Sequence, residues 1–262
     1  MRIAIIGMGK MGAWLARALS ASHEVAAYDR NPGKSAGLGK VKALEGLSGL
    51  SSFAPGMLIN AVSLQNTVMA FDECLAHLPA GCVICDVASV KAGLHEYYGK
   101  SGFKFASVHP MFGPTFANME SLEGENAVVI RESEPSAADF FRNFFSSLGA
   151  RVYDYGFDEH DRMMAYSLTT PFVSSLVFAS CVDGSAVPGS TFSKHMKIAQ
   201  GLLSEDDHLL CEILFNPQSV RQIERITSRL EHLKHIISGR DYEEAQDFLA
   251  KLRQRIRATT QA

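Results

Sequence analysis

Short apolar runs alternate with amphipathic segments along the first 155 residues. The segments Gly12–Ser20 and Pro135–Leu148 carry the spacing of helices that bury one face. The apolar runs predict strands at Arg2–Ile6, Glu24–Tyr28, Met57–Val62, Cys82–Val87, Phe105–Val108, Ala127–Ile130 and Arg151–Tyr155. This alternation predicts a doubly wound α/β fold, in which helices cover both faces of a parallel sheet.

Strand patterns stop after Gly156, and the rest of the chain indicates helices only. We expect them at Asp158–Val182, Ser190–Leu203, Asp206–Ser238 and Tyr242–Thr259. The pattern therefore predicts an α/β domain over residues 1–155 and an all-helical domain over residues 156–262. The long apolar faces of these helices favour a homodimer formed through the helical domain.

Composition excludes several classes of protein. Of 262 residues, 47% are hydrophobic and 20% are charged, with a net charge of −3, so we expect no nucleic-acid-binding footprint. The uncharged stretch Met163–Val182 contains Pro171 and six hydroxyl side chains, so we expect a helix buried in a helical core or a subunit interface there, and no membrane partner. His232 and His235 lack a suitably spaced acidic or cysteine ligand, so we expect no metal site.

The five cysteines predict a reducing compartment. An odd, sparse set does not form a disulfide framework, which favours the cytoplasm. Cys82 and Cys85 have a redox-like spacing, but they lie in a predicted buried strand whose alternation points them to opposite faces. We therefore interpret both as buried structural thiols.

A dinucleotide-binding fingerprint opens the chain. Gly7, Gly9 and Gly12, with Met8, Lys10 and Met11 between them, follow the first strand and begin the first helix. Asp29 ends the second strand, where a carboxylate holds the ribose hydroxyls of NAD. Arg30 follows directly and could pair with a ribose phosphate, so NAD is the expected cofactor and NADP the less favoured one.

Polar residues end three further strands, where ligands bind in parallel sheets. They are Ser63 with Asn60, Ser89, and His109 in the segment from Ser107 to Pro114. A histidine is a side chain that can titrate near neutral pH, so His109 suits acid–base chemistry, whereas its alternative role is structural. Ser89 could equally cap a helix, and Ser63 could belong to an ordinary turn.

These motifs together resemble the prephenate/arogenate dehydrogenase family of tyrosine biosynthesis. The resembling segments are Gly7-x-Gly9-x-x-Gly12, Asp86-Val-Ala-Ser89-Val-Lys91, His109-Pro-Met-Phe-Gly-Pro114 and Glu159-His160-Asp161. The resemblance implies a Rossmann-type nucleotide-binding domain over residues 1–155, joined to an all-helical substrate and dimerisation domain over residues 156–262. It also implies NAD-dependent oxidative decarboxylation of a cyclohexadienyl acid, with His109 as acid/base on the ring hydroxyl and Ser89 bonded to that hydroxyl. Asp161 also suits the start of a helix, which leaves a capping role open for this segment.

The chain departs from the family where many members carry a second histidine and two arginines. We align Phe172 with that histidine, and Ser193 and Gly201 with the arginines. Lys197 shares a helical face with both aligned arginine positions, so Lys197, with Lys194, is our candidate for binding a substrate carboxylate. Thr169 and Thr170 are candidates for binding substrate near the missing histidine.

Three alternatives to prephenate oxidation remain open from the sequence alone. Arogenate dehydrogenase differs only in the substrate's side chain. A β-hydroxyacid dehydrogenase would use a lysine of the helical domain, such as Lys194 or Lys197. A nucleotide-binding regulator without activity would account for the missing arginines, but it would not need the acid/base group of His109.

Overall fold

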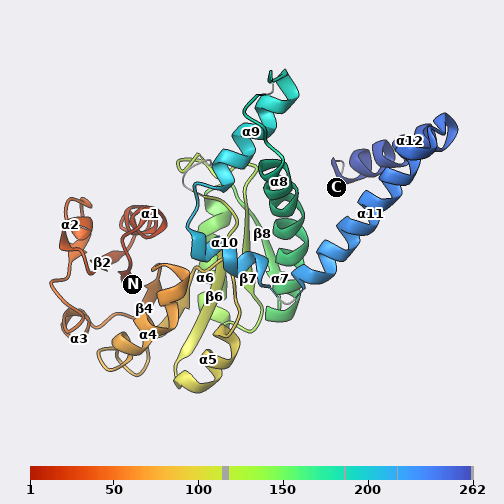
Figure 1. Cartoon of the computed structure of the whole chain (residues 1–262). Coiled ribbons are helices and arrows are strands. Elements are labelled where there is room, and N and C mark those ends of the chain that lie inside the picture. Colours follow the sequence, from red (N-terminus) through yellow and green to blue (C-terminus); the bar gives the residue numbers. More distant parts are fainter. Residues whose placement is uncertain (114–117, 186, 217, 261–262) are drawn as a thin grey trace. The chain divides into compact units, whose positions relative to one another are not determined.

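A computed structural model describes residues 1–113, 118–185, 187–216 and 218–260 (Figure 1). Contacts divide the chain into two units, which are described separately. The sheet unit contains Met1–Met164 and Glu205–Asn216, and the helical unit contains Ala165–Ser204 and Pro217–Ala262. The sheet unit therefore includes two helices beyond the boundary at residue 155 that we expected from the sequence.

One eight-stranded sheet forms the centre of the sheet unit, with strand order β3-β2-β1-β4-β5-β6-β7-β8. Its strands are β1 (Arg2–Ile6), β2 (Glu24–Tyr28), β3 (Lys42–Ala43), β4 (Met57–Asn60), β5 (Val83–Asp86), β6 (Lys104–Pro110), β7 (Asn126–Ile130) and β8 (Arg151–Tyr155). The sheet is mostly parallel, which confirms the predicted fold class.

One pair of strands departs from the parallel arrangement. β7 runs antiparallel to β6, with His109 opposite Val128, and then pairs in parallel with β8. A parallel crossover requires a dozen or more residues, usually with a helix. The described residues between β6 and β7 contain no helix, so the chain returns in the opposite direction.

Helices cover both faces of this sheet. Ile3 and Ile5 of β1 belong to one core cluster and Ala4 and Ile6 to the other, as the alternation of a strand requires. Cys85 and Cys82 are likewise buried in opposite clusters, which confirms their interpretation as structural thiols. The helices and 3₁₀ turn of this unit are α1 (Lys10–Leu19), α2 (Pro32–Ser35), α3 (Gly49–Phe53), η1 (Leu64–Asn66), α4 (Thr67–Leu75), α5 (Leu94–Ser101), α6 (Pro135–Ser147), α7 (Phe157–Met164) and α10 (Asp207–Leu214).

The strand order reverses between β1 and β4. Gly7 follows β1 and Ala61 follows β4, and the Ala61 amide donates to the Ile6 carbonyl at 2.8 Å. Ligands of open α/β sheets bind at such a switch point, beyond the carboxyl ends of the strands. The fold therefore places the glycine fingerprint where a nucleotide is expected.

The helical unit consists of the π-helical turn η2 (Ala165–Thr169) and α8 (Thr170–Ser180), α9 (Ser190–Leu202), α11 (Ser219–Gly239) and α12 (Tyr242–Thr260). Within it, α8 packs against α9 and α11. The described part of the chain contains no helix that is both long and apolar enough to span a membrane.

Two of the long helices expected from the sequence are interrupted. The segment 158–182 forms α7, η2 and α8, and Pro171 lies in the first turn of α8. The segment 206–238 forms α10 and α11, and the intervening Pro217 lies outside the described residues. Proline lacks the amide that a helix interior requires, so the π-helical turn before Pro171 follows from a residue that the periodicity alone does not weigh.

Candidate active site

The glycine turn after β1 is built for close backbone packing. Gly7 has a φ of +86°, and a Cβ there would lie 2.6 Å from the Val62 amide nitrogen. A Cβ on Gly12 would lie 1.9 Å from the Gly7 carbonyl oxygen, whereas a Cβ on Gly9 would meet nothing within 4 Å. The turn is therefore closed at its first and third glycines and open at the second, where α1 begins. This geometry fits a pyrophosphate at a helix N-terminus.

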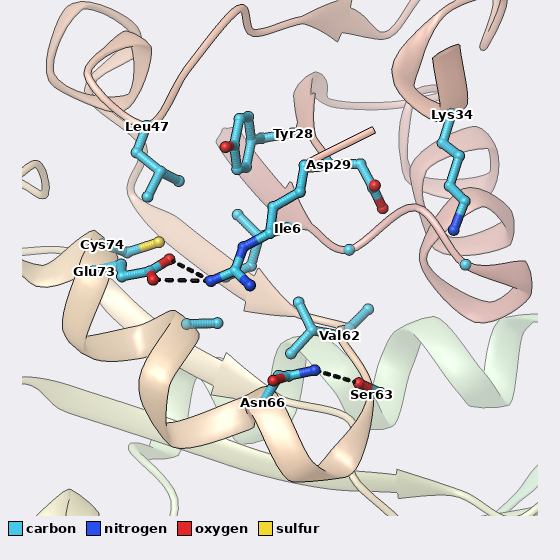
Figure 2. Close-up of a pocket in the computed structure, with 15 residues that line it drawn as sticks. Ile6, Tyr28, Asp29, Lys34, Leu47, Val62, Ser63, Asn66, Glu73 and Cys74 are labelled. Atoms are coloured by element: carbon cyan, nitrogen blue, oxygen red, sulfur yellow. Dashed lines mark hydrogen bonds and ion pairs between the residues drawn. The ribbon is translucent and has the colours of Figure 1, made fainter. Parts of the chain in front are cut away.

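Asp29 is held by the same turn. Its Oδ2 accepts the Met8 amide at 2.7 Å, and its Oδ1 accepts the Asn31 amide at 2.8 Å. The carboxylate is thereby oriented at the end of β2, next to a cavity of about 370 Å³ (Figure 2). A fixed carboxylate in this position suits the hydroxyls of a ribose.

The cavity brings together several of the residues that the sequence indicated. It is lined by Gly7, Gly9, Asp29, Arg30 and Ser63. Met8, Lys10, Met11 and Gly12 lie in the turn and the first turn of α1 and do not line this cavity.

The cavity also contains polar residues that the sequence analysis missed, namely Lys34, Asn66 and Glu73. Asn66 donates to the Ser63 hydroxyl at 2.8 Å, and Glu73 pairs with Arg30 (Figure 2). Lys34 lies only five positions after Asp29, so its proximity was readable from the sequence. Asn66 and Glu73 belong to η1 and α4, whose placement depends on the fold.

His109 lies within β6, because the strand continues to Pro110, two residues beyond the end expected from the pattern. Its imidazole is buried, and its Nδ1 lies 3.0 Å from Nε2 of His160 on α7. Nδ1 of His160 in turn lies 3.1 Å from Oδ1 of Asp161. The three side chains form a continuous chain, His109–His160–Asp161, inside the sheet unit.

Hydrogen bonding fixes the protons along this chain. A carboxylate only accepts, so Nδ1 of His160 carries the proton that Asp161 receives. Neutral His160 then has a bare Nε2, which accepts the Nδ1 proton of His109. This assignment leaves Nε2 of His109 unprotonated, which is the state that a general base requires.

Burial and charge keep both imidazoles neutral. Burial lowers the pKa of His109 well below its usual value, and the neighbouring His160 and Lys91 lower it further. Burial also lowers the pKa of His160, whereas the hydrogen bond from His160 to Asp161 opposes that shift. A proton accepted at His109 is therefore better stabilised at His160, beside the carboxylate.

A buried ion pair joins the Ser89 segment to β6. Lys91 Nζ donates to Asp86 Oδ1 at 2.5 Å and to the Val108 carbonyl, adjacent to His109, at 2.7 Å. Asp86 also accepts the Tyr98 hydroxyl at 2.6 Å and the Ala88 amide at 2.9 Å. Burial lowers the pKa of Lys91, and its pairing with Asp86 opposes that shift. Half-buried Ser89 thus lies in a loop anchored at both ends.

The proposed substrate-binding residues all belong to the helical unit. Lys194 and Lys197 are exposed on α9. Thr169 is buried, and its hydroxyl lies 2.8 Å from the Ser219 hydroxyl, whereas Thr170 begins α8 and is half-buried. Pro114, the last residue of the histidine–proline motif, lies outside the described residues.

The partner of His109 was not derivable from local sequence. His160 lies 51 positions away, and only the resemblance of the segment Glu159-His160-Asp161 drew attention to it. Asp161 has a role beyond the helix cap that was left open, because it orients the His160 ring. Lys91 was part of a quoted motif, but its burial against Asp86 depends on the packing of β5 against β6.

Comparisons with a family model and with individual relatives agree on one protein family. Residues 15–154 match the model of the prephenate dehydrogenase nucleotide-binding domain. Arogenate dehydrogenase 1 of Arabidopsis thaliana is 24% identical over 96% of this chain and 41% of its own length. A probable arogenate/prephenate dehydrogenase of Methanocaldococcus jannaschii is 23% identical over 71% of this chain and 45% of its own length. The chain thus spans less than half of either relative.

Solved structures share the fold over the whole chain. Prephenate dehydrogenase from A. aeolicus, in complex with hydroxyphenyl propionate and NAD⁺, has a TM-score of 0.85 at 18% identity, covering 99% of this chain and 98% of that one. Arogenate dehydrogenase from Synechocystis has a TM-score of 0.76 at 18% identity, covering 99% and 100%. Since the family model covers more than half of its residues, the chain belongs to the prephenate dehydrogenase family.

Proposed function

We propose that the chain oxidatively decarboxylates prephenate to 4-hydroxyphenylpyruvate, with NAD as cofactor and His109 as the base. The observation that carries this proposal is the buried chain His109–His160–Asp161, which leaves one imidazole nitrogen unprotonated. The same unit contains the open glycine turn and the fixed carboxylate of Asp29, which suit NAD. A nucleotide-binding regulator would have no use for a base held in this way.

Each group has a defined task in this mechanism. NAD, when bound, supplies the hydride acceptor. Nε2 of His109 takes the proton of the ring hydroxyl as the carbonyl forms, and Ser89 would bond to that hydroxyl, as in the family it resembles. The His160–Asp161 pair stabilises the positive charge that the proton brings. Loss of the ring carboxylate as carbon dioxide then restores aromaticity in the substrate.

Arogenate is the second candidate substrate, since relatives with both names match the chain. It carries an amino acid side chain in place of the keto acid. We propose prephenate first, with Lys197 and Lys194 binding its side-chain carboxylate and Thr169 and Thr170 supplying hydroxyls. A β-hydroxyacid dehydrogenase is set aside, because the chain belongs to a different family.

One assay tests the proposal. The purified chain is incubated with NAD⁺ and either prephenate or arogenate, NADH formation is followed, and the aromatic product is identified by chromatography. We expect turnover that falls about 10²–10⁴-fold in His109→Asn while NAD⁺ affinity is retained. Tight NAD⁺ binding without NADH from either substrate would contradict the enzyme interpretation and favour a regulator.

We further propose a homodimer in the cytoplasm, formed through the helical unit. This unit exposes large apolar side chains that a second copy could cover, among them Val177, Ile198, Val220, Leu230, Ile237 and Ile256. All five cysteines are free, as a reducing compartment requires. Sedimentation equilibrium should give twice the chain mass, and a monomer at micromolar concentration would contradict the proposal.

A further inference from the structure

An ion pair at the rim of the nucleotide cavity bears on the choice of cofactor. Arg30 Nη2 donates to both carboxylate oxygens of Glu73, at 2.8 and 3.1 Å. Arg30 follows Asp29 at the end of β2, whereas Glu73 lies on α4, and both line the same cavity. The pair thus joins two elements across the cavity rim, as the dashed lines at Glu73 show in Figure 2.

The charges around this cavity give opposite indications when they are considered one at a time. Asp29 disfavours a phosphate on the ribose, because its carboxylate would repel it. Arg30 and Lys34 line the same cavity and would attract such a phosphate. Whether the cavity attracts or repels a ribose phosphate depends on whether the Arg30 guanidinium can bind that phosphate. In the structure the guanidinium is paired with Glu73.

We propose that Glu73 is a specificity-determining residue, which selects NAD over NADP by holding Arg30 at the cavity rim. The ion pair withholds the guanidinium from a 2′-phosphate, and the Glu73 carboxylate adds a second negative charge to the one on Asp29. The planar guanidinium remains at the rim, where such a group can stack on a purine ring. The proposal rests on the nucleotide site and not on the substrate chemistry.

The expected effect is moderate, because the pair is exposed. The side chains of Arg30 and Glu73 are 62% and 42% exposed, and exposed pairs of this kind change an equilibrium by up to about fivefold. Removing one negative charge near a doubly charged phosphate adds a smaller factor in water. We therefore expect Glu73→Gln to tighten NADP⁺ binding about tenfold and to change NAD⁺ binding by less than about threefold.

Titration of the full chain with NAD⁺ and NADP⁺ by calorimetry tests this directly. Asp72→Asn is the matched control, since it removes the same charge one position earlier on α4. Asp72 accepts the Tyr97 hydroxyl at 2.9 Å and does not line the cavity. We expect the control to leave the ratio of the two dissociation constants unchanged. An unchanged ratio in Glu73→Gln, or an equal change in both variants, would overturn the proposal.

A double variant tests whether Glu73 acts through Arg30. In an Arg30→Ala background, Glu73→Gln should tighten NADP⁺ binding only about twofold, because the repulsion by the Glu73 charge is removed but no guanidinium is left to release. The same tightening in both backgrounds would show that Glu73 acts only by its own charge, and the positioning role would be wrong. These titrations need no substrate, so absence of turnover with prephenate or arogenate would leave their outcome intact.

Discussion

Replacing Asp161 by asparagine should reverse the protons along the chain from His109 to Asp161. The asparagine amide can donate to Nδ1 of His160, which then carries its proton on Nε2 and donates to His109. His109 would in turn be protonated at Nε2, the nitrogen that has to accept the substrate proton. The variant preserves size and shape, so the effect isolates the tautomer and the charge.

The expected fall in kcat of Asp161→Asn follows from two contributions to the free energy. Restoring the active tautomer gives up a hydrogen bond between two neutral groups, worth about 1 kcal/mol. Loss of the carboxylate also removes its attraction for the imidazolium, about 3 kcal/mol for charges about 5 Å apart at an effective dielectric constant of 20. The Asp161 side chain is 30% exposed, so solvent reduces the second contribution. We expect kcat to fall by about 10²–10³-fold.

The assay is NADH formation at saturating NAD⁺ with whichever of prephenate and arogenate the chain oxidises. The dissociation constant of NAD⁺ should stay unchanged, because Asp161 does not line the nucleotide cavity. Asp158→Asn is the matched control, since Asp158 is an exposed carboxylate in the first turn of the same helix. A kcat within about threefold of the parent enzyme in Asp161→Asn would refute the proton assignment.

Three further predictions concern the base, the turn and the substrate. Lys91→Met removes a charge that lowers the pKa of His109, so the acidic limb of kcat/KM, where His109 becomes protonated and inactive, should move to higher pH. It should also destabilise the chain by about 3–5 kcal/mol in urea unfolding, and an unmoved limb would contradict the electrostatic role. Gly12→Ala should abolish NAD⁺ binding in calorimetry or prevent folding, since its Cβ would overlap the Gly7 carbonyl; normal affinity would disprove the packing argument. Lys197→Ala should raise KM for the substrate at least about tenfold while kcat holds, as loss of a charged hydrogen bond would; an unchanged KM would remove Lys197 from the site.

Local sequence patterns were sufficient to predict the bounds of an element where these bounds do not depend on its neighbours in the fold. β1, β2 and β8 begin and end where the apolar runs do. β1 and β2 are buried over most of their length and are marked by apolar residues throughout, whereas β8 lies at the edge of the sheet and is largely exposed. The direction of β7 was not readable, since the same residues suit a parallel or an antiparallel pairing. The π-helical turn before Pro171 was readable in principle, because proline acts on the backbone locally.

The residues of the candidate site divide in the same way, into those that local sequence predicts and those whose roles depend on the fold. The glycine turn and Asp29 are close in sequence and were predicted together. His160 and Glu73 each act on a residue more than 40 positions away, so their roles depend on which strand and which helix become neighbours. Lys91 belongs to the same sequence motif as Asp86. Only the packing of β5 against β6 buries this ion pair and brings the Lys91 ammonium to the Val108 carbonyl, next to His109.

The departures from the family fall in one unit only. The proposed base, the residues hydrogen-bonded to it and the glycine turn lie in the sheet unit, whereas Phe172, Ser193 and Gly201, which we align with the expected histidine and arginines, lie in the helical unit. Hydride transfer and loss of carbon dioxide are the same for prephenate and arogenate, so the sheet unit has no need to differ between the two activities. Discrimination requires contacts to the keto or amino group, and the altered residues are candidates for making them. We therefore expect changes in substrate preference to follow substitutions in α8 and α9, with the role of His109 unchanged.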